Sequence, residues 1–318
     1  MKKHLDWNNQ TSIRDVIGGY MTELGKKSQK VLVVNADLMG ASRNRGFVEA
    51  YPERTYDVSI AEQNLVGFSA GLAREGFLPY AFSMAPFISM RACEQCRTDV
   101  AYGNLNVRLV GTYSGVSGGI SGATHWGTED CAILCTMPNM TVLEPSDPVQ
   151  ARKMLDATLT HEGPVYIRCS VEPAVSFYEE TDDYRIGKAT TLRQGDDGAF
   201  LVSGILVKYA WQAAENIEAA TGKKIRVVDM HTIKPIDRES VISAAKTGRL
   251  LAVQDHSVIG GLGYAVAAVL AEEGIAAKFR ILGIPDRFFA MAHAPYLYHQ
   301  FGYDAEGLEK AMLQLLEG

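Results

Sequence analysis

Short apolar runs alternate with segments whose apolar residues recur at helical spacing along the first half of the chain. Residues 12–24 carry apolar side chains every three or four positions and are followed by Gly25, which predicts an amphipathic helix. The run at 31–34 is wholly apolar and predicts a buried strand. The pattern continues with expected strands at 58–60, 78–82, 107–112, 140–144 and 165–169, and with helices at 64–74, 87–101, 127–135 and 148–161.

A polar, acidic and turn-rich stretch at 171–197 interrupts this alternation and predicts a linker with a hairpin. A second series follows, with expected strands at 199–203, 225–229, 250–254 and 279–282 and helices at 206–220, 261–273 and 305–317. Strands and helices in alternation form mostly parallel sheets covered on both faces. We therefore predict an α/β fold of two doubly wound domains, at 1–175 and 199–318, with a linker at 176–198.

Composition narrows the function classes. The chain has 318 residues, enough for two buried cores, and a formal net charge of -6 without a basic run, which argues against nucleic acid as a partner. Apolar stretches are too short for a membrane span, and the polar start at residues 2–4 and 6 does not resemble a signal peptide. The five cysteines, including the pair Cys93 and Cys96, do not suggest a secreted disulfide framework. We expect reduced thiols and a cytoplasmic protein.

Glu62 is the polar residue around which the candidate chemistry gathers. It follows an extended run and opens an apolar, glycine-rich helical pattern. A carboxylate in the first turn of a helix is favoured by the helix dipole and the free N–H groups, so a purely structural role is one interpretation. Gly67 and Gly71 lie four residues apart, which leaves room for a tight helix or subunit contact.

Aromatic and sulfur-containing side chains follow at the end of the next expected strand: Phe82, Met84 and Phe87. A buried carboxyl beside aromatic faces is costly unless a partner satisfies it. A flat ring with nitrogen atoms, stacked on Phe87 and bonded to Glu62, would supply that partner. The alternative is that these apolar residues only fill the core.

A loop rich in glycine and serine at 111–122 follows another expected strand and ends near His125. Such a loop brings its backbone close to a ligand, although it lacks the lysine of a phosphate-binding loop. His125 is a candidate acid–base group because histidine titrates near neutrality, and a surface histidine is the alternative. Arg14, Arg43 and Arg45 lie at element ends, and Arg168 lies inside an apolar strand. Arg168 needs an anionic partner, either a substrate phosphate or a structural carboxylate.

Together these residues resemble the C-terminal half of transketolases, which depend on thiamine diphosphate. The resemblance is strongest to the split form, in which the pyrimidine-binding and C-terminal domains form a separate subunit. It covers nearly the whole chain, and its most specific segments are 36–38, 59–64, 122–125, 140–147, 232–237 and 258–263.

The resemblance implies a role for each candidate residue. Glu62 would bond the aminopyrimidine ring of the cofactor, and His125 would contact the reacting hydroxyls of a ketose donor, which makes these two the catalytic residues. The remaining implied cofactor-binding residues are Phe82, Met84, Phe87, Asp37 and Arg91. The implied substrate-binding residues, besides His125, are Arg14, Arg168, Tyr113, Ser121 and Ser42.

Three positions depart from the family. Ser121 replaces an aspartate that reads a donor hydroxyl, Tyr113 replaces a substrate-binding histidine, and Met84 stands where an aromatic residue is usual. The resemblance therefore does not fix the sugar substrates.

One family feature is missing from the sequence. Members hold Mg²⁺ and the diphosphate with a Gly-Asp-Gly motif followed by an asparagine, and Gly195-Asp196-Asp197-Gly198 lies in the expected linker instead. We therefore expect no metal ligand in this chain and a partner subunit that holds Mg²⁺ and the diphosphate, in an α2β2 assembly. The expected reaction moves a two-carbon ketol unit from a ketose or its phosphate to an aldose phosphate.

Other interpretations are a 1-deoxyxylulose-5-phosphate synthase, the β subunit of a 2-oxo-acid dehydrogenase, or a non-catalytic binding protein of the same fold. The synthase is normally one longer chain, and the dehydrogenase subunit departs from the motifs at Glu62 and His125. A protein that only binds has no chemical need for Glu62, His125, Arg14 and Arg168 together.

Overall fold

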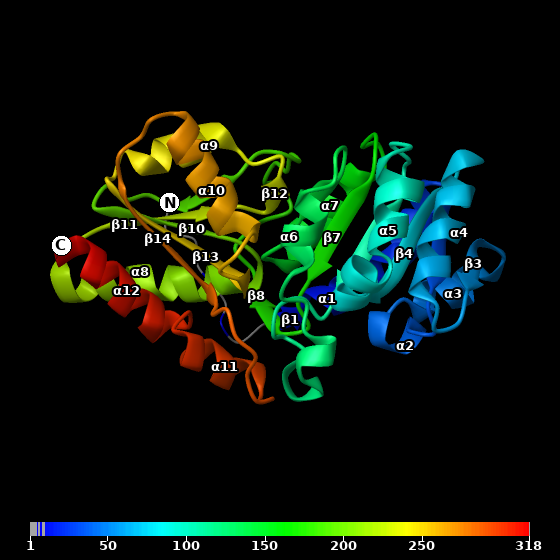
Figure 1. Ribbon diagram of the computed structural model, residues 1–318, viewed down its shortest axis with the longest axis horizontal. Helices are drawn as coiled ribbons and strands as arrows, with labels where there is room; N and C mark the ends of the chain where they lie inside the picture. The colour runs from blue at the N-terminus through cyan, green and yellow to red at the C-terminus, as the bar shows by residue number, and fades with distance from the viewer. Residues whose placement is uncertain (1–4, 6, 8–9, 318) are drawn as a thin grey trace.

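Two α/β units lie side by side in the computed structural model, which describes residues 5, 7 and 10–317 (Figure 1). The polar start at residues 2–4 and 6 lies outside the described residues. The first unit contains the helices α1 (Ile13–Lys27), α2 (Met39–Ser42), α3 (Arg45–Ala50), α4 (Glu62–Arg74), α5 (Cys93–Gln95), α6 (Asp130–Cys135) and α7 (Pro148–Thr158). The second contains α8 (Val207–Thr221), α9 (Arg238–Ala245), α10 (Gly261–Glu272), α11 (Ala294–Phe301) and α12 (Ala305–Glu317).

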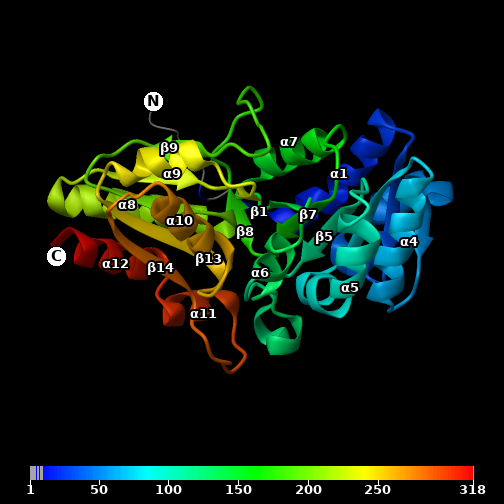
Figure 2. The same cartoon turned by 45° about the horizontal axis from the view of Figure 1, so that its top comes forward.

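A seven-stranded sheet forms the centre of the first unit, in the order β12-β6-β7-β5-β4-β2-β3. Its strands are β12 (Thr232–Lys234), β6 (Thr141–Leu143), β7 (Val165–Cys169), β5 (Arg108–Thr112), β4 (Leu78–Met84), β2 (Val31–Asn35) and β3 (Thr55–Asp57). All neighbours are parallel except β12 and β6. Residues from α1 and α7 join one buried cluster and residues from α4 and α6 the other, so helices cover both faces (Figure 2).

A five-stranded sheet forms the centre of the second unit, in the order β14-β13-β10-β11-β9. Its strands are β14 (Lys278–Ile284), β13 (Arg249–Ser257), β10 (Gly198–Val202), β11 (Ile225–Asp229) and β9 (Thr190–Arg193), and only β9 is antiparallel. A two-stranded antiparallel ribbon of β1 (Gln10–Ser12) and β8 (Pro173–Val175) completes the sheets. The predicted α/β class with mostly parallel sheets is confirmed.

Several local expectations were wrong. The stretch 171–197 does not form a hairpin, because its strand β8 pairs with β1 and its strand β9 pairs with β11 of the second sheet. The second strand is Thr55–Asp57 rather than 58–60, and the expected helix at 87–101 is broken into π-helical turns at Phe87–Arg91 and Cys96–Ala101 around α5. The strand β12 and the helices α9 and α11 were not expected at all. Within the described part of the chain, no helix is long and apolar enough to cross a membrane.

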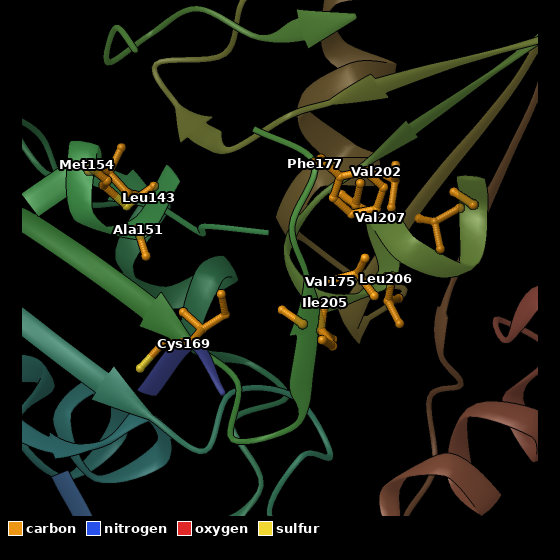
Figure 3. Close-up of a cluster of buried hydrophobic side chains, with 14 of the residues drawn as sticks. Leu143, Ala151, Met154, Cys169, Val175, Phe177, Val202, Ile205, Leu206 and Val207 are labelled. Atoms are coloured by element: carbon orange, nitrogen blue, oxygen red, sulfur yellow. The ribbon is translucent and has the colours of Figure 1, made fainter. Parts of the chain in front are cut away.

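The two units share their hydrophobic cores. Leu143, Ala151 and Met154 of the first unit belong to the same buried cluster as Val202 and other residues of the second (Figure 3). Figure 3 shows Val175 and Phe177, on the connecting segment, beside Val202 and its neighbours of the second unit. Strand β12 adds a second link, because it leaves the C-terminal unit to pair with β6 of the other sheet. The units are therefore joined by packing and by backbone pairing.

Arg168 lies at the centre of this junction with no exposed surface. Its Nε donates to both carboxylate oxygens of Asp130, at 3.1 and 2.8 Å, and its Nη1 donates to Glu144. Its Nη2 donates to the backbone carbonyls of Gly127 (2.9 Å) and Asp255 (2.6 Å). Because every donor nitrogen has a partner and the side chain is sealed from solvent, the prediction that Arg168 binds a substrate phosphate is wrong. The structural-carboxylate alternative accounts for it.

Carboxylates of the first unit connect Arg168 to the second unit. Glu144 Oε2 accepts hydrogen bonds from Ser203 Oγ and Gln254 Nε2, both at 2.7 Å. Buried ion pairs of this kind compensate for desolvation only when their remaining hydrogen-bonding capacity is satisfied. The negative carboxylates around Arg168 raise the pKa of its guanidinium despite the opposing effect of burial, so it stays charged.

Replacement of Arg168 by methionine should therefore lower the free energy of unfolding by about 3–5 kcal/mol, because Asp130 and Glu144 would remain buried without a counter-ion. Denaturant unfolding measures the change. The matched control is Arg152→Met, which removes an ion pair between Arg152 and Glu180 that is open to solvent and should cost less than about 1 kcal/mol. Equal losses for the two variants would contradict the central role of Arg168.

Candidate active site

The candidate residues gather at one edge of the seven-stranded sheet, where the parallel strands β2, β4 and β5 end. Asp37 follows β2, Met84 ends β4, and Tyr113 follows β5. Parallel neighbours present their carboxyl ends at the same edge, and α/β folds bind ligands there. The predicted position of the site is consistent with this arrangement.

Glu62 begins α4 and is almost wholly buried, with 1% of its surface exposed. The chain reaches it through Ser59, whose φ of 62° lies in the left-handed region. Its carboxylate accepts a hydrogen bond from Ser83 Oγ (3.1 Å) and one from Arg91 Nη1 (2.7 Å). The position of this buried carboxylate at a helix N-terminus therefore suits it to accept hydrogen bonds from planar N–H donors.

Phe87 forms a wall beside this carboxylate. The Arg91 guanidinium lies over the Phe87 ring, 4.3 Å from its centroid, while it also bonds Glu62. The rings of Phe87 and His125 meet edge to face, with centroids 5.5 Å apart. The structure therefore brings together Glu62, Phe87, Arg91 and His125 from three separate segments.

The other predicted cofactor contacts differ in how far their side chains are buried. Met84 is half-buried at the end of β4, and Asp37 is exposed after β2, where its backbone N–H donates to Asp57 Oδ1 (3.1 Å). Phe82 is wholly buried within the hydrophobic core. The prediction that Phe82 touches the cofactor is therefore wrong, because alternation along β4 turns this side chain into the core.

The glycine-rich loop after β5 is folded on itself. The N–H of Gly115 donates to the Gly127 carbonyl (2.8 Å), and the Trp126 indole donates to the Gly119 carbonyl (3.0 Å). Positive φ angles at Tyr113 (60°) and Gly115 (57°) make the turn possible. His125 is half-buried with Nδ1 2.8 Å from Thr124 Oγ1, and Ser121 is exposed on the same loop.

Arg14 and Tyr113 form a second polar group at this edge. Arg14 Nη1 donates to the Tyr113 hydroxyl (3.3 Å), and Arg14 Nε bonds Asp15 (2.9 Å). Asp15 also lies 3.4 Å from the exposed Arg43. Ser42 is buried, and its hydroxyl has no hydrogen-bond partner among the described residues, so contact with a substrate would require its exposure. Arg14 keeps partly exposed donor groups that suit an anion.

Two features were missed from the sequence. A pocket of about 240 Å³ lies between the units, lined by residues that include Met90, Trp126, Arg287 and Phe288. Asp255, at the end of β13, reaches the glycine-rich loop from the second unit. The one sequence feature that could have indicated Asp255 is its polar character after the apolar run 250–253. The loop that contains Arg287 has no sequence feature that indicates a pocket.

Metal-binding groups are scarce. Among the described residues, the one cluster of three suitable side chains is Asp130, Cys131 and His256, all buried, and Asp130 is already paired with Arg168. Cys93 and Cys96 are free thiols, and burial raises the pKa of Cys96 far above its ordinary value, which makes that thiol unreactive.

Comparison with known proteins shows the family to which the chain belongs. Residues 9–173 match the pyrimidine-binding domain of transketolase, and residues 187–308 match the transketolase C-terminal domain. The chain is 39% identical to the 6-deoxy-6-sulfo-D-fructose transketolase subunit SqwH of Clostridium sp. strain MSTE9, over 96% of this chain and 94% of that protein. It is 34% identical to one of the subunits of the apulose-4-phosphate transketolase of Phocaeicola vulgatus, over 98% and 99% of the two chains.

A solved structure described as a split gene transketolase in an inactive beta4 tetramer is 36% identical, with a TM-score of 0.89, over 96% of this chain and 98% of that chain. The chain therefore belongs to the transketolase family. Within it, the chain is the C-terminal subunit of a split transketolase, with a pyrimidine-binding and a C-terminal domain, as the resemblance predicts.

Replacement of Gly115 by alanine should disrupt the glycine-rich loop. A Cβ at this position would lie 2.0 Å from Asp255 Cγ, and the φ of 57° is itself unfavourable for alanine. We expect a loss of about 3 kcal/mol in the free energy of unfolding. Gly40→Ala is the control, because no atom lies within 4 Å of its added Cβ, and it should change stability by less than about 1 kcal/mol. Denaturant unfolding of both variants measures the difference, and equal stabilities would contradict the close fit at Gly115.

Proposed function

We propose that this subunit, together with a partner, transfers a two-carbon ketol unit from a ketose or its phosphate to an aldose phosphate. The observation that carries the proposal is the buried Glu62 carboxylate beside the Phe87 wall. In its support, the two curated relatives are named as transketolase subunits.

The residues present fit the pyrimidine end of thiamine diphosphate. The Arg91 guanidinium is planar, carries N–H donors, stacks on Phe87 and bonds Glu62. An aminopyrimidine ring has the same flat shape and a ring nitrogen that Glu62 can engage once Arg91 moves aside. When bound, the cofactor supplies the nucleophilic carbon and the electron sink of ketol transfer.

The chain's own residues then have distinct roles. Glu62 holds a proton at the ring nitrogen, and Phe87 with Met84 orients the ring. Arg91 and Asp37 would be further contacts of the cofactor. His125 moves a proton at the reacting hydroxyl of the ketose. Ser121, on the exposed part of the same loop, faces the donor.

The anionic end of a sugar substrate suits Arg14 and Tyr113. The names of the two relatives indicate sugars that carry a sulfonate or a phosphate, both of which are anions. Arg14 offers the partly exposed guanidinium that such a group needs, and the Tyr113 hydroxyl lies beside it. Ser42 is the remaining candidate for substrate contact.

A partner subunit completes the site. We assign Mg²⁺ and the diphosphate to the partner, because the Gly-Asp-Gly motif that holds them in the family is missing from this sequence. Three apolar side chains within six residues of Glu62 in the sequence are exposed, namely Ile60 (72% exposed), Tyr56 and Phe68. Such a patch is typical of a subunit contact and supports an active site at the interface, in an α2β2 assembly. The free cysteines are compatible with the cytoplasmic location that we propose.

Titration calorimetry with thiamine diphosphate and Mg²⁺ tests the shared site. We expect binding only after co-expression with the subunit that carries the diphosphate-binding domain, because this chain supplies just the pyrimidine side. In the complex, Glu62→Gln should lower turnover at least about a thousandfold while the assembly stays intact. Tight binding by this chain alone would refute the shared site, and near-normal turnover by the variant would refute the role of Glu62.

Arg14→Ala should raise the KM for a phosphorylated aldose about ten- to a hundredfold, since a charged hydrogen bond to the anion is lost. The KM for an aldose without phosphate should stay unchanged. Arg45→Ala, which changes an exposed arginine nearby, is the control and should affect neither value. An identical response to both aldoses would remove Arg14 from anion binding.

A further inference from the structure

Asp255 is a buried carboxylate of the second unit that bonds the glycine-rich loop of the first unit. It lies near the end of β13, and 2% of its surface is exposed. Its two carboxylate oxygens accept the N–H of Val116, at 3.1 and 3.2 Å, across the junction between the units. Val116 belongs to the glycine-rich loop, three residues after Tyr113.

Other residues of the second unit hold the Asp255 carboxylate in place. Tyr303 donates its hydroxyl to Asp255 Oδ1 (2.8 Å), and Tyr298 donates to Oδ2 (3.3 Å). The backbone carbonyl of Asp255 accepts from Arg168 Nη2. These contacts come from the helix α11, the residues after it and the buried arginine, so the Asp255 side chain has little freedom to move.

The loop backbone is shaped to fit this carboxylate. Gly115, next to Val116, has no room for a side chain because a Cβ would meet Asp255 at 2.0 Å. The same loop is closed by the pair between Gly115 and Gly127, and His125 lies just before that closure. A shift at Val116 would therefore reach both Tyr113 and His125.

We infer that Asp255 is a positioning residue for the reaction: it holds the glycine-rich loop so that Tyr113 and His125 face the substrate. The inference rests on the proposed function, because that function assigns substrate contacts to Tyr113 and His125. It gives the C-terminal domain a part in substrate binding, through a residue that does not touch the substrate.

Asp229 provides a matched control. It is also wholly buried in the second unit, and its Oδ2 accepts hydrogen bonds across the same junction from Ser146 (2.5 Å) and Gln150 (2.9 Å). Burial raises the pKa of both Asp229 and Asp255 to about 6. Asp229 contacts the region around α7 instead of the loop.

The experiment compares Asp255→Asn with Asp229→Asn in the complex with the partner subunit. For Asp255→Asn we expect a KM for the ketose donor raised about tenfold or more. The affinity for thiamine diphosphate should change much less, because Glu62 is held by Ser83 and Arg91, which lie outside the loop. Amide hydrogen exchange of the full chain should speed up at 113–127 in this variant. Asp229→Asn should alter neither the donor KM nor exchange in that segment.

Tyr303→Phe is a milder second variant in case Asp255→Asn does not fold, and it should shift the same two quantities in the same direction. Unchanged exchange at 113–127, or the same donor KM effect in Asp229→Asn, would overturn the inference. The exchange measurement needs no turnover. If exchange at 113–127 speeds up in Asp255→Asn but the unmodified complex shows no ketol transfer, the proposed function is rejected while the contact between Asp255 and the loop stands.

Discussion

The buried guanidinium of Arg168 is the interaction on which the packing of the two units depends. Arg168 stands inside the first sheet and bonds Asp130, Glu144 and two backbone carbonyls, one of which is that of Asp255 in the second unit. Desolvating such a charge is expensive, so every neighbouring oxygen must stay in place. The requirement fixes the two units relative to each other. It also fixes the strand end from which Asp255 reaches the active-site loop.

The candidate active site differs from the junction, because its charged groups are not fully buried with hydrogen-bond partners from this chain. Glu62 is buried but bonded to an arginine that is 48% exposed, and Phe87 presents part of its face to solvent. Ile60 and Phe68, close to Glu62 in the sequence, are apolar and exposed. A rigid junction next to an open, incomplete site is a physical basis for a subunit that functions in an assembly.

Sequence and structure agree where a local signal was strong. Glu62 opens α4, and the loop at 111–122 follows a strand, because apolar periodicity and glycine content determine these features locally. Phe82 and Arg168 show the limit of such signals. An aromatic residue at a strand end and an arginine within a strand suit either a ligand or the core, and only the faces of the folded sheet distinguish the two.

The sequence by itself determined the α/β class and the family, since both depend on patterns between neighbours in the chain. It also predicted two domains and the segments to which we assign the chemistry. Only the tertiary structure decided which hydrogen bonds cross the junction, that β12 joins the first sheet, and that Asp255 bonds the glycine-rich loop. Val116 and Asp255, for example, are 139 positions apart in the chain. The geometry of such contacts depends on how two cores pack together, which leaves no periodic trace in the sequence.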